Sequence, residues 1–244
     1  MAETKFYTEQ FRVMDCDCDM NHRLTAGAFL RLAQQISTDQ CESIGMNDNF
    51  YRQNHAVFLL AKQALQVDRV PRGGEVLTLV TMPEQCKRAV FKRVTEARDE
   101  KGERVALLDS RWVLVDTDTR RILRRPPQAF EAFHFEDEVP FTLDVAIRKP
   151  AETAPAGRVT ATYSRCDTNG HMNNTRYADA AADVLPLEVL TRGAVKSLVI
   201  SYHNELPAGQ SAELVLGRDE NGGWYVAGQR EDGKPCFEAV LTVE

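Results

Sequence analysis

The stretch that decides the fold is 167–174, Asp167-Thr168-Asn169-Gly170-His171-Met172-Asn173-Asn174, which stands directly before a helical pattern. A related stretch precedes a helix near the start of the chain. Three identities lie 152 positions apart: Asp15, Met20 and Asn21 against Asp167, Met172 and Asn173. After each helix come segments rich in β-branched and aromatic residues, which favour strands. The repeated order predicts a duplicated α+β fold, in which each unit is an antiparallel sheet wrapped around one central helix.

These patterns divide the chain into two units and a connector. Apolar residues at helical spacing predict helices over Thr25–Cys41 and Thr175–Leu185. Strands are expected over 56–70, 76–81, 89–97 and 105–116 in the first unit, and over 158–163, 195–203, 212–218, 224–230 and 236–243 in the second. Five prolines between 124 and 155 interrupt regular structure. We therefore place the units at 1–130 and 156–244, with a linker at 131–155.

The composition is that of a soluble globular protein. Of 244 residues, 43% are hydrophobic, and the net charge of −6 disfavours a surface that binds nucleic acid as a whole. No run approaches 18 apolar residues, and the first residues lack the pattern of a signal peptide. We therefore expect a cytoplasmic protein without membrane insertion, in which the six cysteines are free thiols.

Three polar side chains alternate in the second unit: Asp167, Asn169 and His171. Alternate residues of an extended chain share a face, so these side chains could converge on one substrate atom, while Gly170 allows close backbone approach. The competing interpretation is a polar turn that caps the following helix, with an asparagine of 173–174 as N-cap. A cap and a site can coexist in this loop.

The first unit differs at the corresponding positions. There the same alternation places Asp15, Asp17 and Asp19, and carboxylates have no proton to donate to a carbonyl or its oxyanion. Only the second unit is therefore expected to perform chemistry. A further acid, Glu205, follows the strand expected over 195–203, where by itself it would be a solvated strand end. The chain has no G-x-S-x-G motif, which disfavours a serine hydrolase.

The pattern D-x-N-x-H-x-N-N, with S-Y-x-x-E about thirty residues later, resembles the acyl-ACP thioesterases of plants and bacteria. Two further segments resemble the same family, W-V-L-V-D-T-D-T-R-R at 112–121 and V-D-R-V-P at 67–71. The resemblance implies a double hot-dog fold and hydrolysis of fatty acyl-ACP to free fatty acid and holo-ACP, without metal or cofactor. It implies four site residues: Asp167, Asn169, His171 and Glu205. Plant members often have a cysteine after this glutamate, and Leu206 stands there, so water is the expected nucleophile.

Hydrolysis of a thioester needs a donor to the carbonyl oxygen and a base for water. We expect Asn169 to polarise the carbonyl and Asp167 to hold the polar cluster in place. Glu205 and His171 would activate water and share the proton transfer, in roles that could be exchanged. The first unit would hold the fatty acyl chain in an apolar tunnel between its helix and its sheet.

A basic cluster in this acidic chain is expected to dock the acidic acyl carrier protein. It comprises Arg120, Arg121, Arg124 and Arg125, with Lys87, Arg88, Lys92 and Arg93 on another strand region. Solvation of a strand edge is the simpler explanation of such residues. The alternative functions are an acyl-CoA thioesterase, a dehydratase and a non-catalytic acyl-binding module, and a homodimer is left open.

Overall fold

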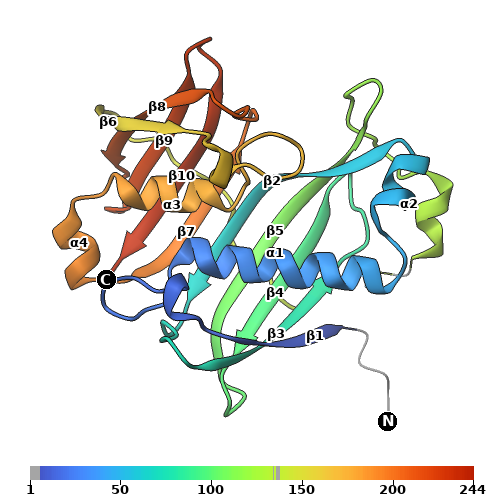
Figure 1. Cartoon of the computed structure of the whole chain (residues 1–244), viewed down its shortest axis with the longest axis horizontal. Helices are drawn as coiled ribbons and strands as arrows, with labels where there is room; N and C mark the ends of the chain where they lie inside the picture. The colour runs from blue at the N-terminus through green and yellow to red at the C-terminus, as the bar shows by residue number, and fades with distance from the viewer. Residues whose placement is uncertain (1–5, 134, 136–137) are drawn as a thin grey trace.

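A computed structural model describes residues 6–133, 135 and 138–244 of the chain. In this part of the chain, ten strands form one antiparallel sheet in the order β1-β3-β4-β5-β2-β7-β10-β9-β8-β6 (Figure 1). The strands are β1 (Tyr7–Arg12), β2 (Ala56–Val67), β3 (Val76–Pro83), β4 (Phe91–Arg98), β5 (Arg104–Asp116), β6 (Thr153–Thr160), β7 (Val195–Tyr202), β8 (Ser211–Arg218), β9 (Trp224–Arg230) and β10 (Pro235–Val243). The α-helices are α1 (Ala26–Ser43), α2 (Asp48–Gln53), α3 (Arg176–Asp183) and α4 (Leu187–Arg192).

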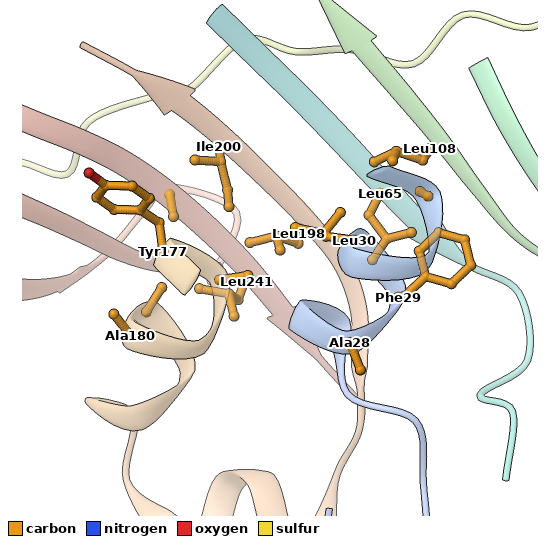
Figure 2. Packing of buried hydrophobic residues seen from close by; sticks show 14 of the residues in the cluster. Ala28, Phe29, Leu30, Leu65, Leu108, Tyr177, Ala180, Leu198, Ile200 and Leu241 are labelled. Carbon is orange, nitrogen blue, oxygen red and sulfur yellow. The ribbon is translucent and has the colours of Figure 1, made fainter. Parts of the chain in front are cut away.

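The sheet order is symmetric about the junction between β2 and β7. Strands β1 to β5 with α1 form the first half, and β6 to β10 with α3 form the second (Figure 1). The halves share one core, because Leu30 of α1 and Leu65 of β2 belong to the same buried cluster as Leu198 of β7 (Figure 2). The predicted α+β fold of two units, each a sheet with a helix packed on it, is confirmed.

Helix α1 forms where its apolar spacing predicts it. The Thr25 side chain caps the helix by accepting a hydrogen bond from the Ala28 N–H at 3.1 Å, which stabilises a helix by about 1 kcal/mol. Leu30 and Ile36 lie on the face turned to the sheet and are fully buried. The helix is therefore fixed in position by the residues that the sequence pattern identified.

Several elements depart from the predicted pattern. The helix α3 ends at Asp183, and Pro186 precedes a second helix, α4, because its fixed φ of −53° suits helix entry. Strand β6 begins at Thr153, inside the expected linker, and tolerates Pro155 because it is an edge strand. The strand β1 and the helix α2 were not predicted.

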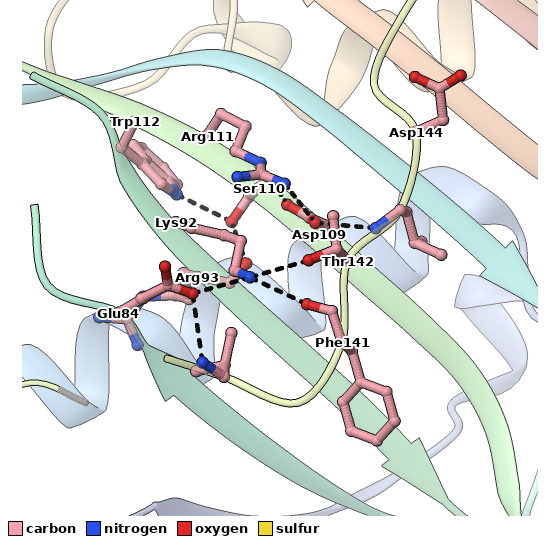
Figure 3. A network of polar contacts seen from close by, with 12 residues as sticks. Glu84, Lys92, Arg93, Asp109, Ser110, Arg111, Trp112, Phe141, Thr142 and Asp144 are labelled. Atoms are coloured by element: carbon pink, nitrogen blue, oxygen red, sulfur yellow. Dashed lines mark hydrogen bonds and ion pairs between the residues drawn. The ribbon is translucent and has the colours of Figure 1, made fainter. Parts of the chain in front are cut away.

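The chain between the halves forms an extended strap, residues 138–152, on the face of the sheet opposite α1 (Figure 3). Neighbouring side chains of β4 fix this placement, since successive residues of a strand point to opposite faces. Arg93 donates to Gln40 of α1 at 2.8 Å, whereas the Lys92 ammonium donates to the Phe141 carbonyl oxygen of the strap at 3.1 Å.

Buried ionic groups fasten the strap to the sheet. The side chains of Glu84 and Lys92 are 6% and 8% exposed, and Oε2 lies 2.8 Å from Nζ. The same Glu84 oxygen accepts the Val139 N–H at 3.3 Å. Asp109, which is fully buried, accepts the Leu143 N–H at 3.0 Å. Part of the predicted connector is thus an ordered element of the fold.

Candidate active site

The loop from Cys166 to Met172 is built by its own backbone. These two residues form an isolated β-bridge, and the Asp167 N–H donates to the His171 carbonyl oxygen at 3.0 Å. Gly170 has a φ of +78°, a conformation that a residue with a Cβ adopts only with strain. The sharp turn therefore brings Asp167, Asn169 and His171 together within one short segment.

A second segment is held against this loop. The Met172 N–H donates to the Leu206 carbonyl oxygen at 2.9 Å, and His171 forms a β-bridge with Pro207. Both contacts lie just beyond β7, at the point where the chain turns away from the sheet. This pairing places Glu205 beside His171, although the two residues are distant in the sequence.

The imidazole of His171 lies between two carboxylates. Its Nδ1 is 3.6 Å from Asp167 Oδ2 and its Nε2 is 3.6 Å from Glu205 Oε1. Both distances are slightly longer than a direct hydrogen bond, as is common in unliganded catalytic sites. Asp167 and His171 are each about one-fifth exposed and Glu205 is 42% exposed. An imidazole in this position can exchange protons with either acid.

The side-chain carboxamide of Asn169 is exposed and lines a cavity. Its backbone N–H donates to Asp167 Oδ1 at 2.9 Å, while its exposed side chain makes no hydrogen bond with any described residue. Both Asn169 and Asp167 line a cavity of about 300 Å³. His171 and Glu205 do not line the cavity themselves. His171 lies beside Asp167, which does, and Glu205 lies on the other side of His171. The four predicted site residues thus lie near one another, and two of them line the cavity.

The cavity runs between this loop and α1 of the other half. Gln34 and Cys41 both line it and are separated by about two helical turns, or about 10 Å. Further along, the lining is aromatic and includes Phe58, Phe91 and Trp112. The rings of Phe58 and Phe91 stack edge to face at 4.9 Å between centroids. The lining is mixed, because charged side chains such as Glu42, Asp48 and Arg93 stand among these aromatic rings.

Arg93 is a buried cation in the cavity wall, although it was predicted to belong to the docking cluster. Arg93 is only 9% exposed and donates to Gln40 Oε1 at 2.8 Å and to Thr81 Oγ1 at 3.0 Å. Burial lowers the pKa of this guanidinium. Lys92 is buried on the opposite face of the sheet, so the expectation that both residues join a docking surface is wrong. The strand alternation of β4 was the signal that could have identified Arg93.

The predicted docking arginines lie beyond β5 and are exposed: Arg120, Arg121, Arg124 and Arg125. None of them forms an ion pair with a described residue. Leu123, between the two arginine pairs, packs against the aromatic cluster that includes Phe58 and Phe91. The arginines therefore belong to a segment that packs beside this aromatic cluster.

Residues 18–24 form a loop of the same construction as residues 166–172. In each loop, the first and last residues form a β-bridge. The N–H of the second residue donates to the carbonyl oxygen of the sixth, from Asp19 to Arg23 at 2.8 Å and from Asp167 to His171 at 3.0 Å. The fifth residue has a positive φ, His22 at +57° and Gly170 at +78°. These contacts relate the two loops by 148 residues, so the offset of 152 inferred from three identities is wrong.

The corrected register changes what the first loop contains. Asp19, Asn21 and Arg23 replace the expected trio of aspartates as the counterparts of Asp167, Asn169 and His171. The Leu24 N–H donates to the Pro71 carbonyl oxygen at 2.8 Å, as the Met172 N–H donates to that of Leu206, which places Val70 opposite Glu205. The first loop keeps the aspartate and the asparagine but lacks the imidazole and the second acid.

This duplicated architecture, in which each half is a sheet with a helix packed on it, is that of a double hot-dog protein. The model of the acyl-ACP thioesterase N-terminal domain matches residues 4–133, and that of the acyl-ACP thioesterase C-terminal domain matches residues 149–234. The chain belongs to the acyl-ACP thioesterase family.

Curated relatives and solved structures agree with this family. The oleoyl-acyl carrier protein thioesterase 2 of Arabidopsis thaliana is 22% identical over 82% of this chain and 59% of that protein. The acyl-[acyl-carrier-protein] hydrolase FATB1 of Cuphea viscosissima is 28% identical over 78% of this chain and 49% of that protein. The chain therefore spans 59% and 49% of the length of these two relatives.

The same fold occurs in solved structures across nearly the full chain. An acyl-ACP thioesterase from Bacteroides thetaiotaomicron superposes with a TM-score of 0.84 at 21% identity, covering 98% of each chain. The 12:0-ACP thioesterase from Umbellularia californica superposes with a TM-score of 0.82 at 16% identity, covering 100% of this chain and 99% of that one. At these identities the comparison establishes the fold.

Proposed function

We propose that this protein is an acyl-ACP thioesterase that hydrolyses fatty acyl-ACP to free fatty acid and holo-ACP, which ends fatty acid synthesis. The observation that carries the proposal is the imidazole of His171 between Asp167 and Glu205, next to a cavity that Asn169 and Asp167 line. Membership of the acyl-ACP thioesterase family supports the choice of substrate.

The proposed reaction uses water as nucleophile. The Asn169 carboxamide donates to the thioester carbonyl oxygen and to the oxyanion that develops on it. Glu205 takes a proton from water as its oxygen attacks the carbonyl carbon, and His171 exchanges that proton with Glu205. The carbon–sulfur bond then breaks, and the leaving thiolate takes the proton from the imidazole. Asp167 orients the imidazole, and the roles of Glu205 and His171 can be exchanged.

The positions of the cysteines support water rather than a thiol as nucleophile. All six cysteines are free, as predicted. The residue after Glu205 is the buried Leu206. The thiol of Cys166, next to Asp167 in sequence, donates to the Ala161 carbonyl oxygen at 3.6 Å. Cys41 lines the cavity, but about two helical turns beyond Gln34.

The two halves would divide the work, with the boundaries 1–130, 131–155 and 156–244. The second half supplies the polar cluster, and the first half supplies α1 and the aromatic walls against which the acyl chain would lie. The difference in helix length supports this division, since α1 has 18 residues and α3 has 8. The longer helix can line a longer cavity.

The test is a panel of purified acyl-ACPs of increasing chain length, assayed for free fatty acid, with the matching acyl-CoAs in parallel. We expect turnover of acyl-ACP with a preference for ACP over CoA. Turnover of acyl-CoA alone would identify an acyl-CoA thioesterase. Binding of the acyl chain without turnover would identify a non-catalytic acyl-binding module, and dehydration of a hydroxyacyl chain would identify a dehydratase.

The exposed arginines after β5 are proposed to dock the acidic carrier. Charge reversal by Arg124→Glu and Arg125→Glu should raise KM for acyl-ACP several-fold and flatten its salt dependence, because rim charges act mainly on association. Hydrolysis of a small acyl-CoA should change little and serves as the control. Equal losses on both substrates would indicate misfolding, and an unchanged KM for acyl-ACP would assign these arginines to solvation of the surface.

Several expectations about the surroundings of the protein stay predictions: the cytoplasmic location, a homodimer, and hydrolysis without metal or cofactor. No helix within the described residues has the length and hydropathy needed to cross a membrane. Among the same residues, no group of three or more His, Cys, Asp or Glu side chains is arranged to hold a metal ion.

A further inference from the structure

A second cavity, also of about 300 Å³, lies beside the loop 18–24 of the first half. Aliphatic side chains form much of its wall: Leu65, Val67, Val70, Ala178, Ala182 and Leu190. Apolar cavities of about half this volume already bind small hydrocarbons and exclude water. The cavity is therefore large enough for a stretch of alkyl chain.

The two cavities occupy equivalent places in the duplicated fold. The first is bounded by the loop 166–172 of the second half and by α1 of the first half. The second is bounded by the loop 18–24 of the first half and by α3 of the second half. Each cavity thus combines the polar loop of one half with the helix of the other half. Because the two cavities are equivalent, the class of ligand in the first cavity predicts the class of ligand in the second.

The second cavity lacks the groups for hydrolysis. Arg23 stands where His171 stands in the other loop, and a guanidinium neither accepts nor releases a proton at neutral pH. Its Nε donates to Asp19 Oδ2 at 2.9 Å and its Nη2 to the Leu190 carbonyl oxygen at 2.7 Å, so it is held in place. Val70 replaces Glu205, so no acid stands at the position from which Glu205 would activate water in the other loop.

The charges around the second cavity select against a carboxylate. Three lining residues, Asp19, Asp179 and Asp183, are acidic, whereas Arg23 is the one cation among the lining residues that the structure describes. Arg23 is already paired with Asp19, and Asp179 is paired with Arg31 at 2.9 Å. No unpaired cation among the described lining residues therefore remains to hold a fatty acid anion, whereas a thioester head carries no charge.

We propose that the cavity beside residues 18–24 is a second acyl-binding site, which holds the chain of an uncharged acyl thioester and does not hydrolyse it. The choice of an acyl ligand rests on the proposed function of the other cavity. The site would let one protein bind two acyl groups, of which one is cleaved.

The test counts bound acyl chains by calorimetry with S-dodecyl-pantetheine, a thioether that cannot be hydrolysed. We expect two molecules per native protein. Val70→Trp should fill the second cavity, reduce the count to one and keep hydrolysis of dodecanoyl-ACP within twofold. Ser37→Trp, which fills the cavity along α1, is the matched control and should leave one bound molecule while hydrolysis is lost. Ala182→Phe fills the second cavity from α3 if Val70→Trp does not fold.

The outcomes separate the two proposals. One bound molecule in the native protein and none in Ser37→Trp would overturn the second site. The second site would also be overturned if the native protein and the Val70→Trp variant both bound two molecules, provided that the variant unfolds cooperatively and is therefore folded. Dodecanoate binding at the second site as tightly as the thioether would refute the argument from charge. Failure of the native protein to hydrolyse any acyl-ACP would refute the proposed function, while the count of bound molecules would still be measured.

Discussion

Replacing His171 with alanine should lower kcat for acyl-ACP hydrolysis by about a hundredfold or more, the usual loss for a removed acid–base group. The imidazole is the group within 3.6 Å of both Asp167 and Glu205. Without it, a proton taken by Glu205 has no relay to the leaving thiolate. Because the side chain lies in a partly exposed loop and packs no core, the variant should keep its thermal midpoint within a few degrees.

Asn169→Ala should show a loss of similar size, because one lost oxyanion donor costs about a hundredfold or more. The chain supplies a matched control in Asn21→Ala, the same substitution at the equivalent place in loop 18–24. Steady-state kinetics with acyl-ACP should show near-native turnover for Asn21→Ala. If folded Asn169→Ala turned over normally, the carbonyl-polarising role would be lost, and normal turnover in Asp167→Ala and His171→Ala as well would overturn the site.

Sequence patterns predicted the long elements that bury many apolar side chains. The helix α1 carries apolar residues at helical spacing, and β5 contains two groups of β-branched and aliphatic residues, 105–108 and 113–115, so both were found within a few positions. The short elements β1, α2 and α4 depend on tertiary contacts. In β1, polar residues such as Glu9 and Gln10 mask the strand pattern, which appears only through pairing with β3.

The site was predictable to the extent that it is local in sequence. Asp167, Asn169 and His171 lie within five residues, so the loop alone places them together. Glu205 was assigned through a family resemblance, and its position beside His171 depends on the pairing of His171 with Pro207. The register between the loops at 18–24 and 166–172 could not be read from identities, because backbone hydrogen bonds define the equivalence and the side chains have diverged.

Replacing Glu84 with leucine should lower the free energy of unfolding by about 3–5 kcal/mol, the cost of removing one partner of a buried ion pair. Lys92 would then be a buried cation without its carboxylate, since its side chain is 8% exposed. Burial raises the pKa of Glu84, but hydrogen bonds from Lys87 and Lys92 outweigh it and keep the carboxylate ionised. The Val139 N–H of the strap would also lose its acceptor.

The double variant Glu84→Leu with Lys92→Met is the decisive comparison in urea unfolding. Replacing both partners of a buried ion pair by apolar side chains removes the uncompensated charge and is often neutral or stabilising. We therefore expect the double variant to recover most of the stability that the single variant loses. Equal destabilisation in the two variants would mean that the lost contacts with Val139 and Phe141 of the strap, rather than the buried charge, set the cost. A single variant within 0.5 kcal/mol of the native protein, the range of ordinary surface substitutions, would show that this pair does not hold the strap.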